Sequence, residues 1–157
     1  MCRVLTLACL VAAVAAGVAP AADSRLGSIT AAETSLLRAV NGARAAHGLA
    51  PLVIDPTLER AARAHSADML RRHYFAHGAF AQRLSSFGAR GPVLGENLAW
   101  GTGRMPGTRT VALWLASPPH RANLLRAGFR RVGVATPVGA FGGFGEATVV
   151  TADFAGS

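Results

Sequence analysis

Three side chains in this sequence are of types that can hold a cation or move a proton. His77 follows an aromatic pair, Glu96 follows Gly95, and His120 follows two prolines. Two imidazoles and a carboxylate can bind a divalent cation of the zinc type and leave positions open for water or a ligand. The same groups can also act as a metal-free acid and base. Their spacings of 19 and 24 residues match no local metal motif, so the residues alone leave both alternatives open.

An amphipathic helix is predicted near the start of the globular part of the chain. Thr30 and Glu33 form a capping-box pattern, and apolar residues then recur every three or four positions. The pattern predicts a first helix over residues 31–47. The residues before it, 22–30, are interpreted as a tether that leads into the domain.

A second helix is expected shortly afterwards. Asp55 can accept hydrogen bonds from free backbone amides, and Pro56 suits the first helical position, so a helix is predicted to run from there to about Arg72. His65 lies on the apolar face of this helix. We therefore expect a buried histidine whose ring nitrogens are satisfied by hydrogen bonds, rather than a ligand.

After residue 72 the helical periodicity of the apolar residues ends. From His73 to Gly95 no periodicity is visible, which predicts a long irregular connection that carries His77. Helices first and a glycine-rich hairpin last indicate an α+β fold. The later elements predicted are short helices over 110–116 and 120–126, and strands over 131–136 and 147–154.

The first 21 residues have the composition of a cleaved secretory signal peptide. Arg3 gives a positive start, residues 4–19 are apolar, and small residues at 19 and 21 suit signal peptidase. A run of sixteen apolar residues is shorter than the roughly 20 that a spanning helix needs, so the processed chain is not expected to span a membrane. Both cysteines fall in this segment, Cys2 and Cys9. The expected mature chain therefore has no disulfide, and its stability must come from packing.

Composition and charge indicate the number of domains and the classes of molecule that the protein could bind. With 157 residues, 51% hydrophobic and 15% charged, the chain fits a single globular domain, and we expect a monomer. Its sixteen basic residues are all arginine and exceed eight acidic ones, for a net charge of +8. Outside the cytoplasm this charge would meet anionic cell-envelope polymers or lipid headgroups. The arginines are scattered and no aromatic-basic motif is present, so nucleic acid is not an expected partner.

Five motifs follow one another along residues 36–154. Together they resemble the CAP superfamily, also called the SCP domain, which comprises cysteine-rich secretory proteins, antigen 5 (allergen V5) venom proteins and plant pathogenesis-related proteins. The motifs are His65-Ser66-x-Asp68-Met69, Tyr74-Phe75-x-His77, Gly95-Glu96-Asn97-Leu98-Ala99-Trp100-Gly101, Trp114-Leu115-x-Ser117-Pro118-x-His120-Arg121-x-Asn123-Leu124-Leu125, and Val132-Gly133-Val134 with Thr151-x-Asp153-Phe154.

The resemblance implies an α-β-α sandwich over residues 31–157, with a small antiparallel sheet between helical layers and a central cleft. By position, His77, Glu96 and His120 match the family's cleft residues, which in several members take up zinc or another divalent ion. Arg121, beside His120, is expected in the same cleft, where it would pair with Glu96 or with an anionic ligand. A surface salt bridge is the alternative for this arginine.

The sequence departs from the family pattern at the helix that carries Trp114. Where animal and plant members have a second glutamate, this chain has Ala116-Ser117-Pro118, as short bacterial members do. With one carboxylate fewer, the cleft is expected to hold Zn²⁺ or another divalent cation only weakly. The absence of the eukaryotic disulfides also favours the short bacterial branch.

Two functions remain open from the sequence. The first is a binding module of the bacterial cell envelope, secreted or periplasmic, whose cleft takes a cation, a lipid or a wall-derived ligand. The alternative is a peptidase-like hydrolase in which Glu96 activates water with help from the histidines or a metal. Ser117 is not expected to be a nucleophile, because it precedes proline and no Gly-x-Ser-x-Gly turn is present. Asn97 is assigned a structural role, and Trp100 and Trp114 are assigned to the core.

Overall fold

A computed structural model describes residues 29–156, so the predicted signal peptide and most of the predicted tether lie outside the described residues. Five helices and five strands follow one another along the described chain. They are α1 (Ala31–Ala46), β1 (Val53–Ile54), α2 (Pro56–Arg72), α3 (Phe80–Ser86), β2 (Leu94–Thr102), α4 (Gly107–Ala116), α5 (Pro118–Leu124), β3 (Phe129–Ala135), β4 (Val138–Phe141) and β5 (Phe144–Gly156). Between residues 29 and 156, no helix combines the length and the apolar character needed to cross a bilayer.

The two long helices begin as the sequence predicts. At α1 the backbone N–H of Thr30 donates to Glu33 Oε2 (2.8 Å), and the N–H of Glu33 donates to Thr30 Oγ1 (3.2 Å), which completes the capping box. At α2 the carboxylate of Asp55 accepts from the N–H of Thr57 (2.8 Å). Helix α2 ends at His73, which is left-handed (φ 53°) and turns the chain away from the helix axis.

The sheet has the order β1-β3-β5-β2, and β4 pairs with the start of β5. Strand β5 is 13 residues long and pairs antiparallel with β2, β3 and β4. The short strand β1 runs parallel to β3, so the expected sheet is antiparallel except for this one pair. Strand β2 lies at one edge of the sheet, and this position matters for the site described below.

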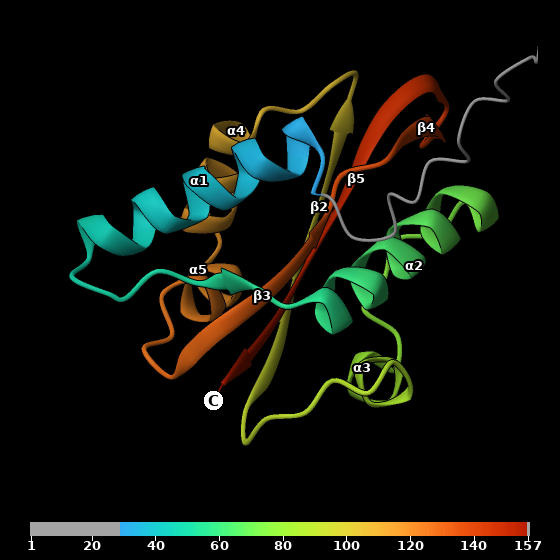
Figure 1. The fold of residues 1–157 in the computed structure, drawn as a ribbon. Coiled ribbons are helices and arrows are strands. Elements are labelled where there is room, and N and C mark those ends of the chain that lie inside the picture. Colours follow the sequence, from blue (N-terminus) through green and yellow to red (C-terminus); the bar gives the residue numbers. More distant parts are fainter. Residues whose placement is uncertain (1–28, 157) are drawn as a thin grey trace, which may run out of the picture.

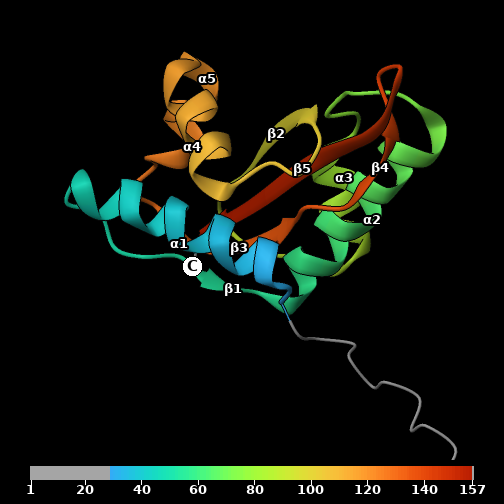
Figure 2. The same ribbon diagram turned by 90° about the horizontal axis from the view of Figure 1, so that it is seen from above.

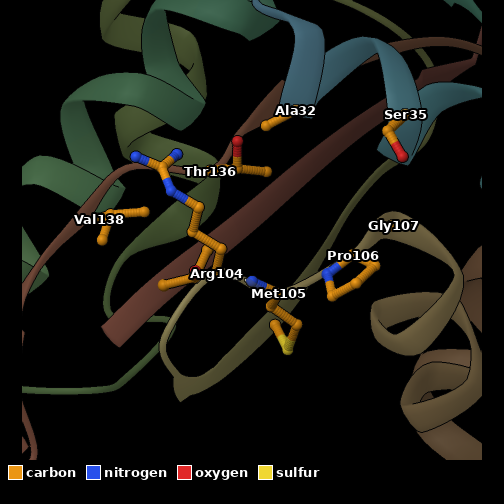
Figure 3. A pocket seen from close by; sticks show the side chains of 9 residues that line it. Ala32, Ser35, Arg104, Met105, Pro106, Gly107, Thr136 and Val138 are labelled. Atoms are coloured by element: carbon orange, nitrogen blue, oxygen red, sulfur yellow. Dashed lines mark hydrogen bonds between the residues drawn. The ribbon is translucent and has the colours of Figure 1, made fainter. Parts of the chain in front are cut away.

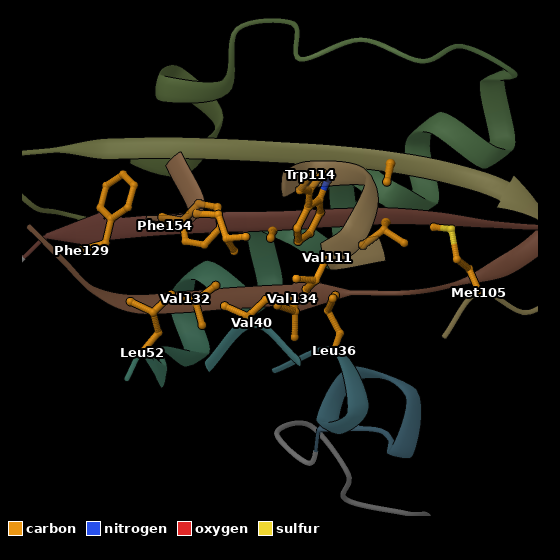
Figure 4. Packing of buried hydrophobic residues seen from close by; sticks show 14 residues of the cluster. Leu36, Val40, Leu52, Met105, Val111, Trp114, Phe129, Val132, Val134 and Phe154 are labelled. Atoms are coloured by element: carbon orange, nitrogen blue, oxygen red, sulfur yellow. The ribbon is translucent and has the colours of Figure 1, made fainter. Parts of the chain in front are cut away.

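Helices cover both faces of the sheet (Figures 1 and 2). On one face lie α1, α4 and α5, and on the other lie α2 and α3. The α-β-α sandwich expected from the sequence is therefore confirmed. The larger part of the core fills the first interface, where Leu36 and Val40 of α1 and Trp114 of α4 meet strands β3 and β5 (Figure 4). Smaller clusters around Leu58 and Met69 of α2 fill the second interface.

Two glycines set how closely the helical layers approach. A Cβ on Gly133 of β3 would lie 2.0 Å from the backbone carbon of Leu58, so α2 rests directly on the sheet. A Cβ on Gly107 would lie 2.6 Å from the Cα of Leu36, so α4 begins in direct backbone contact with α1. Real Cβ atoms do not come this close to backbone, and only glycine fits at either contact.

Four elements were not expected from the sequence, namely β1, α3, β2 and β4. The connection predicted as irregular from His73 to Gly95 contains α3, and it ends where the long strand β2 begins. The segment 138–141 forms β4 rather than part of a turn. The assignment of Trp100 to the core is wrong, since its side chain is 37% exposed at the end of β2, whereas Trp114 is 1% exposed and donates Nε1–H to the carbonyl of Leu98 (2.9 Å).

Candidate functional site

The candidate site lies at edge strand β2, whose side chains contact both helical layers. Successive side chains of a strand point to opposite faces, so Glu96 and Asn97 reach different layers. Glu96 faces the α2 and α3 side, where its carboxylate meets His77 and Arg83. Asn97 faces α5 and donates from Nδ2 to the backbone carbonyl of His120 (2.9 Å). The predicted residues are thus drawn from both layers to one edge of the sheet.

The carboxylate of Glu96 is the centre of this cluster. Its side chain is 1% exposed, and its two oxygens have different partners. Oε1 accepts from Nδ1 of His77 (2.7 Å), and Oε2 forms a salt bridge with Nη2 of Arg83. Arg83 also donates from Nη1 to the backbone carbonyl of His77 (3.1 Å), so it fixes the loop as well as the charge. A buried carboxylate with a partner at each oxygen is held in one orientation.

The two histidine rings of the site lie near each other. Their ring centroids are 6.5 Å apart, with the rings tilted by 36°. Nδ1 of His77 is held by Glu96, and Nδ1 of His120 lies 2.8 Å from the hydroxyl of Ser117. Among residues 29–156, neither Nε2 atom has a hydrogen-bond partner. Both rings are therefore anchored at one nitrogen and offer the other.

Two asparagines tie the backbone of β2 to helix α5. Besides the bond from Asn97 to His120, the Nδ2 of Asn123 donates to the backbone carbonyl of Glu96 (3.0 Å) and to the side-chain oxygen of Asn97 (3.2 Å). Asn97 is fully buried. Its structural role, which was expected from the sequence, is to fix the helix that carries His120.

His65 lies beneath the loop that carries His77. It is buried, and its Nε2 lies 3.0 Å from the backbone carbonyl of Ala76 and 3.8 Å from Oε2 of Glu96. Burial lowers the pKa of His65, so the neutral ring donates Nε2–H to Ala76. This is the hydrogen-bonded buried histidine that the sequence predicts.

Burial also favours the neutral form of His120. Its pKa is lowered first by burial and then by the neighbouring His77. A neutral imidazole with a free Nε2 is the form that binds a metal ion.

Asp153 is a site neighbour that the sequence analysis did not assign to the cleft. It lies directly across from Glu96 in the register of β2 and β5, it is fully buried, and neither of its carboxyl oxygens has a hydrogen-bond partner. Burial, followed by the charge of Glu96, raises the pKa of Asp153 well above its ordinary value. A single acidic residue within the apolar run 149–155 was the available signal, since such a residue cannot reach solvent from a central strand.

The arginine that pairs with Glu96 is Arg83, which comes from the unexpected helix α3. Arg121 is exposed on α5, and no contact between it and Glu96 is present among the described residues. No local pattern marked Arg83, because its partner lies 13 residues away on a different element.

The donor set offers two nitrogens rather than three convergent ligands. In residues 29–156, no group of three histidine, aspartate or glutamate side chains is arranged to hold a metal ion. Glu96 turns both oxygens toward His77 and Arg83, so it orients one imidazole instead of pointing into the space between the rings. Two imidazoles fit a weak, open site in which water or a ligand supplies the other positions.

Hollows in the surface lie beside this cluster and away from it. Two of them, both lined by His65, Tyr74 and Arg83, open on the α2 side next to the residues that hold Glu96. A third lies between the start of α1 and the turn before α4, where Met105 and Pro106 form an apolar wall (Figure 3). None of the residues predicted for the cleft lines this third hollow.

Comparisons with known proteins agree with this architecture. The family model of the cysteine-rich secretory protein family, CAP, matches residues 37–154. An uncharacterized protein, YkwD, from Bacillus subtilis strain 168 is 37% identical over 112 residues, which are 68% of this chain and 43% of that protein. The chain thus spans less than half the length of this curated relative.

Solved structures show the same fold. An extracellular protein containing an SCP domain from Bacillus anthracis has a TM-score of 0.65 and 26% identity, over 83% of this chain and 45% of that chain. An outer surface protein from Borrelia burgdorferi has a TM-score of 0.64 and 23% identity, over 78% of this chain and 90% of that chain. With the family match over most of its length, and with the sandwich described above, this chain belongs to the CAP superfamily of SCP-domain proteins, in a bacterial branch.

Proposed function

We propose that this protein is an extracytoplasmic binding module whose cleft holds a divalent cation between His77 and His120. The observation that carries the proposal is that the two rings are hydrogen-bonded in the same way. Each has its Nδ1 held by an oriented oxygen, from Glu96 or from Ser117, while its Nε2 has no hydrogen-bond partner among the described residues, and the two ring centroids are 6.5 Å apart. Histidine ligands of metals are commonly fixed in this way by a second hydrogen bond.

Each neighbouring group has a distinct role in this proposal. Glu96 orients the ring of His77, and Ser117 orients the ring of His120. Arg83 balances the charge of Glu96, so that the carboxylate stays directed at His77. A bound cation would supply an electrophilic centre for an anionic group of the ligand. With two protein ligands, binding is expected to be weak, as the missing second glutamate implies.

Binding is better supported than hydrolysis. The hydrolase alternative requires Glu96 to take a proton from water, and a general base must be within hydrogen-bond reach of that water. The Glu96 side chain is 1% exposed, and both of its oxygens are engaged. The geometry therefore suits a carboxylate that holds a ring in place rather than one that receives protons.

The location and the ligand are part of the same proposal. The Bacillus anthracis protein is described as extracellular and the Borrelia protein as an outer surface protein, which supports export of this chain through the predicted signal peptide. A lipid or wall-derived fragment with an anionic group fits a cation held by two imidazoles. Because the chain spans only part of YkwD and of the Bacillus anthracis chain, these assignments refer to the CAP domain itself.

A calorimetric titration with zinc tests the cation site. The parent should bind one equivalent, and the His77→Ala and His120→Ala variants should each lose binding while keeping the parent's circular dichroism spectrum. His47→Ala is the matched control, because His47 is exposed at the end of α1 and should bind zinc as the parent does. If the parent does not bind zinc, or if both variants bind it as well as the parent, the proposed cation site is wrong.

A further inference from the structure

The hairpin formed by β4 and the start of β5 has no polar side chain over eight consecutive residues. Residues 138–145 read Val-Gly-Ala-Phe-Gly-Gly-Phe-Gly. Most of this hairpin is exposed, including Val138 at 37% and Phe144 at 49%. Exposed turns usually carry polar residues, and a run of exposed apolar residues in a folded protein normally has a function.

Aromatic side chains from three separate segments gather around this hairpin. The ring of Trp100 at the end of β2 lies 5.3 Å from Phe141 and 6.4 Å from Phe144, measured between centroids. Phe75, from the loop after α2, lies 6.4 Å from Phe141. Phe141 is buried, whereas Phe75, Trp100 and Phe144 are 41%, 37% and 49% exposed. We call these three exposed rings and residues 138–145 the hairpin patch.

The hairpin patch has a fixed base and a projecting tip. The position of Gly139 lies against Leu70 of α2, and Phe141 and Val149 pack with Met69. Beyond this base the hairpin extends past the helices, at the end of β5 opposite the C-terminus (Figures 1 and 2). Within the hairpin, the backbone is paired between β4 and β5, with Phe141 opposite Phe144.

Basic side chains border the hairpin patch. Arg71 and Arg72 end helix α2, and their side chains are 69% and 68% exposed. The guanidinium of Arg72 lies 5.4 Å above the ring of Tyr74, which itself packs against the cluster that contains Phe141. Both arginines also pair with Asp68, and Glu146 lies at the foot of the hairpin, so the border is mixed in charge but carries two extended cations.

These features favour a lipid surface over a carbohydrate. A sugar-binding platform needs polar side chains next to its aromatic rings to bind hydroxyl groups, and residues 138–145 offer none. Tryptophan and phenylalanine at a projecting tip, with arginines set behind them, match the arrangement that enters the boundary between headgroups and acyl chains. Arginine at the border can then contact anionic headgroups.

We propose that the hairpin patch docks this protein on the surface of a phospholipid bilayer that contains anionic lipids. Phe75, Trp100 and Phe144 enter the interfacial layer, and Arg71 and Arg72 contact the headgroups. The docking surface shares no side chain with the His77 and His120 cleft. It therefore goes beyond the cation proposal, and either can fail without the other.

Sedimentation with vesicles tests this docking. The chain starting at residue 22 keeps every described element and lacks the apolar segment 4–19, which would itself bind lipid. This protein should sediment with vesicles of phosphatidylcholine and phosphatidylglycerol, and more weakly with phosphatidylcholine alone. Phe144→Ser should weaken binding about tenfold, since burying one phenylalanine contributes at least that much. Val53→Ser is the matched control, because Val53 is 60% exposed on β1, far from the hairpin, and its loss should leave binding unchanged.

Tryptophan fluorescence gives a second readout. Of the two tryptophans, only Trp100 is exposed, so vesicles should shift its emission to shorter wavelength, and brominated lipids should quench it. Trp100→Phe should abolish the shift while sedimentation persists. The proposal is overturned if the parent does not bind vesicles, or if Phe144→Ser binds as tightly as Val53→Ser. Binding to insoluble wall glycan instead, with the same dependence on Phe144, would also overturn it.

Discussion

Glu96 and Asp153 stand opposite each other on β2 and β5 and place two carboxyl groups side by side on one face of the sheet. Only Glu96 has cationic and hydrogen-bonding partners, namely Arg83 and His77. Asp153 is fully buried, and its raised pKa means that it keeps a proton where an exposed aspartate would have lost it. The raised pKa of Asp153 thus favours its uncharged form beside the carboxylate that Arg83 and His77 hold.

This arrangement predicts how Asp153→Asn changes stability with pH. A carboxyl whose pKa is higher in the folded than in the unfolded state stabilises the fold fully below the unfolded value, and this contribution is lost as the pH rises through the folded value. The parent should thus lose stability relative to the variant as the pH rises above about 4, the ordinary aspartate value, until it passes the raised pKa of Asp153. Above this range we expect the variant to be the more stable of the two proteins.

Urea unfolding of both proteins at acidic and neutral pH provides the measurement. Asp68→Asn is a useful control, because the hydrogen bond from Tyr74 lowers the pKa of Asp68, and that difference should have the opposite sign. A difference between the parent and the Asp153→Asn variant that does not change with pH would contradict the protonated state.

Removal of Arg83 should destabilise the fold through Glu96. The variant Arg83→Gln leaves a buried carboxylate without its cation, which typically costs about 3–5 kcal/mol. Combining it with Glu96→Gln removes the charge as well and should recover most of the loss. The free energies of unfolding of the parent, the two single variants and the double variant give the coupling directly. Additive losses in this cycle would show that the two side chains do not act as a pair.

Ser117→Ala separates cation binding from folding. The hydroxyl contacts Nδ1 of His120 but makes no capping hydrogen bond to α5, so its removal should leave the unfolding midpoint almost unchanged. Zinc affinity should fall about tenfold, as for other residues that orient a histidine ligand. Ser86→Ala, which removes an exposed hydroxyl from the end of α3, should change neither quantity. Equal zinc affinity in the parent and the Ser117→Ala variant would remove Ser117 from the site.

Arg44 is a buried cation whose hydrogen-bond partners are all backbone carbonyls. It donates to Ala50 (2.9 Å), Leu124 (2.9 Å), Arg126 (3.1 Å) and Phe129 (3.2 Å), and it is fully buried in α1. Arg44→Met should therefore destabilise the protein by roughly 2–4 kcal/mol, since several buried carbonyls lose their donor. Arg44→Lys should recover only part of this, because an ammonium cannot reproduce the planar set of donors. The exposed Arg38 of the same helix is the control, and Arg38→Met should leave the unfolding midpoint unchanged.

The elements that sequence reasoning located best are those with local signals. Helices α1 and α2 are predicted by their apolar periodicity and by the residues at their N-terminal ends. These are Thr30 and Glu33 for α1, and Asp55 and Pro56 for α2. Strand β2 gave no such signal, because the polar residues Glu96 and Asn97 interrupt any alternation. Their burial depends on partners in α3 and α5, which no window of the sequence contains. Helix α3 has no side-chain cap and only seven residues, so its presence is decided by packing.

The site residues also divide into those that the sequence selected and those that only the structure revealed. The family resemblance selected His77, Glu96 and His120, and the structure brings Glu96 to His77 and places the two histidine rings 6.5 Å apart. It did not indicate that Arg83 would occupy the second oxygen of Glu96, because that contact depends on a helix that the sequence left undefined. The exposure of Trp100 was not predicted either. Its apolar neighbours suggested burial, but β2 lies at the edge of the sheet, and α2 packs over β3 and β5 instead.

The glycine contacts at Gly133 and Gly107 have a mechanical consequence for ligand capture. Backbone rests on backbone at both places, so α2 is fixed to the sheet and α4 is fixed to α1 without a compressible layer of side chains between them. The chain leading to His77 departs from α2, and the chain leading to His120 departs from α4. The segments that carry His77 and His120 thus each leave a rigidly packed helix. A ligand between the two rings would then be bound or released by rotation of the imidazoles and by movement of the short segments that carry them.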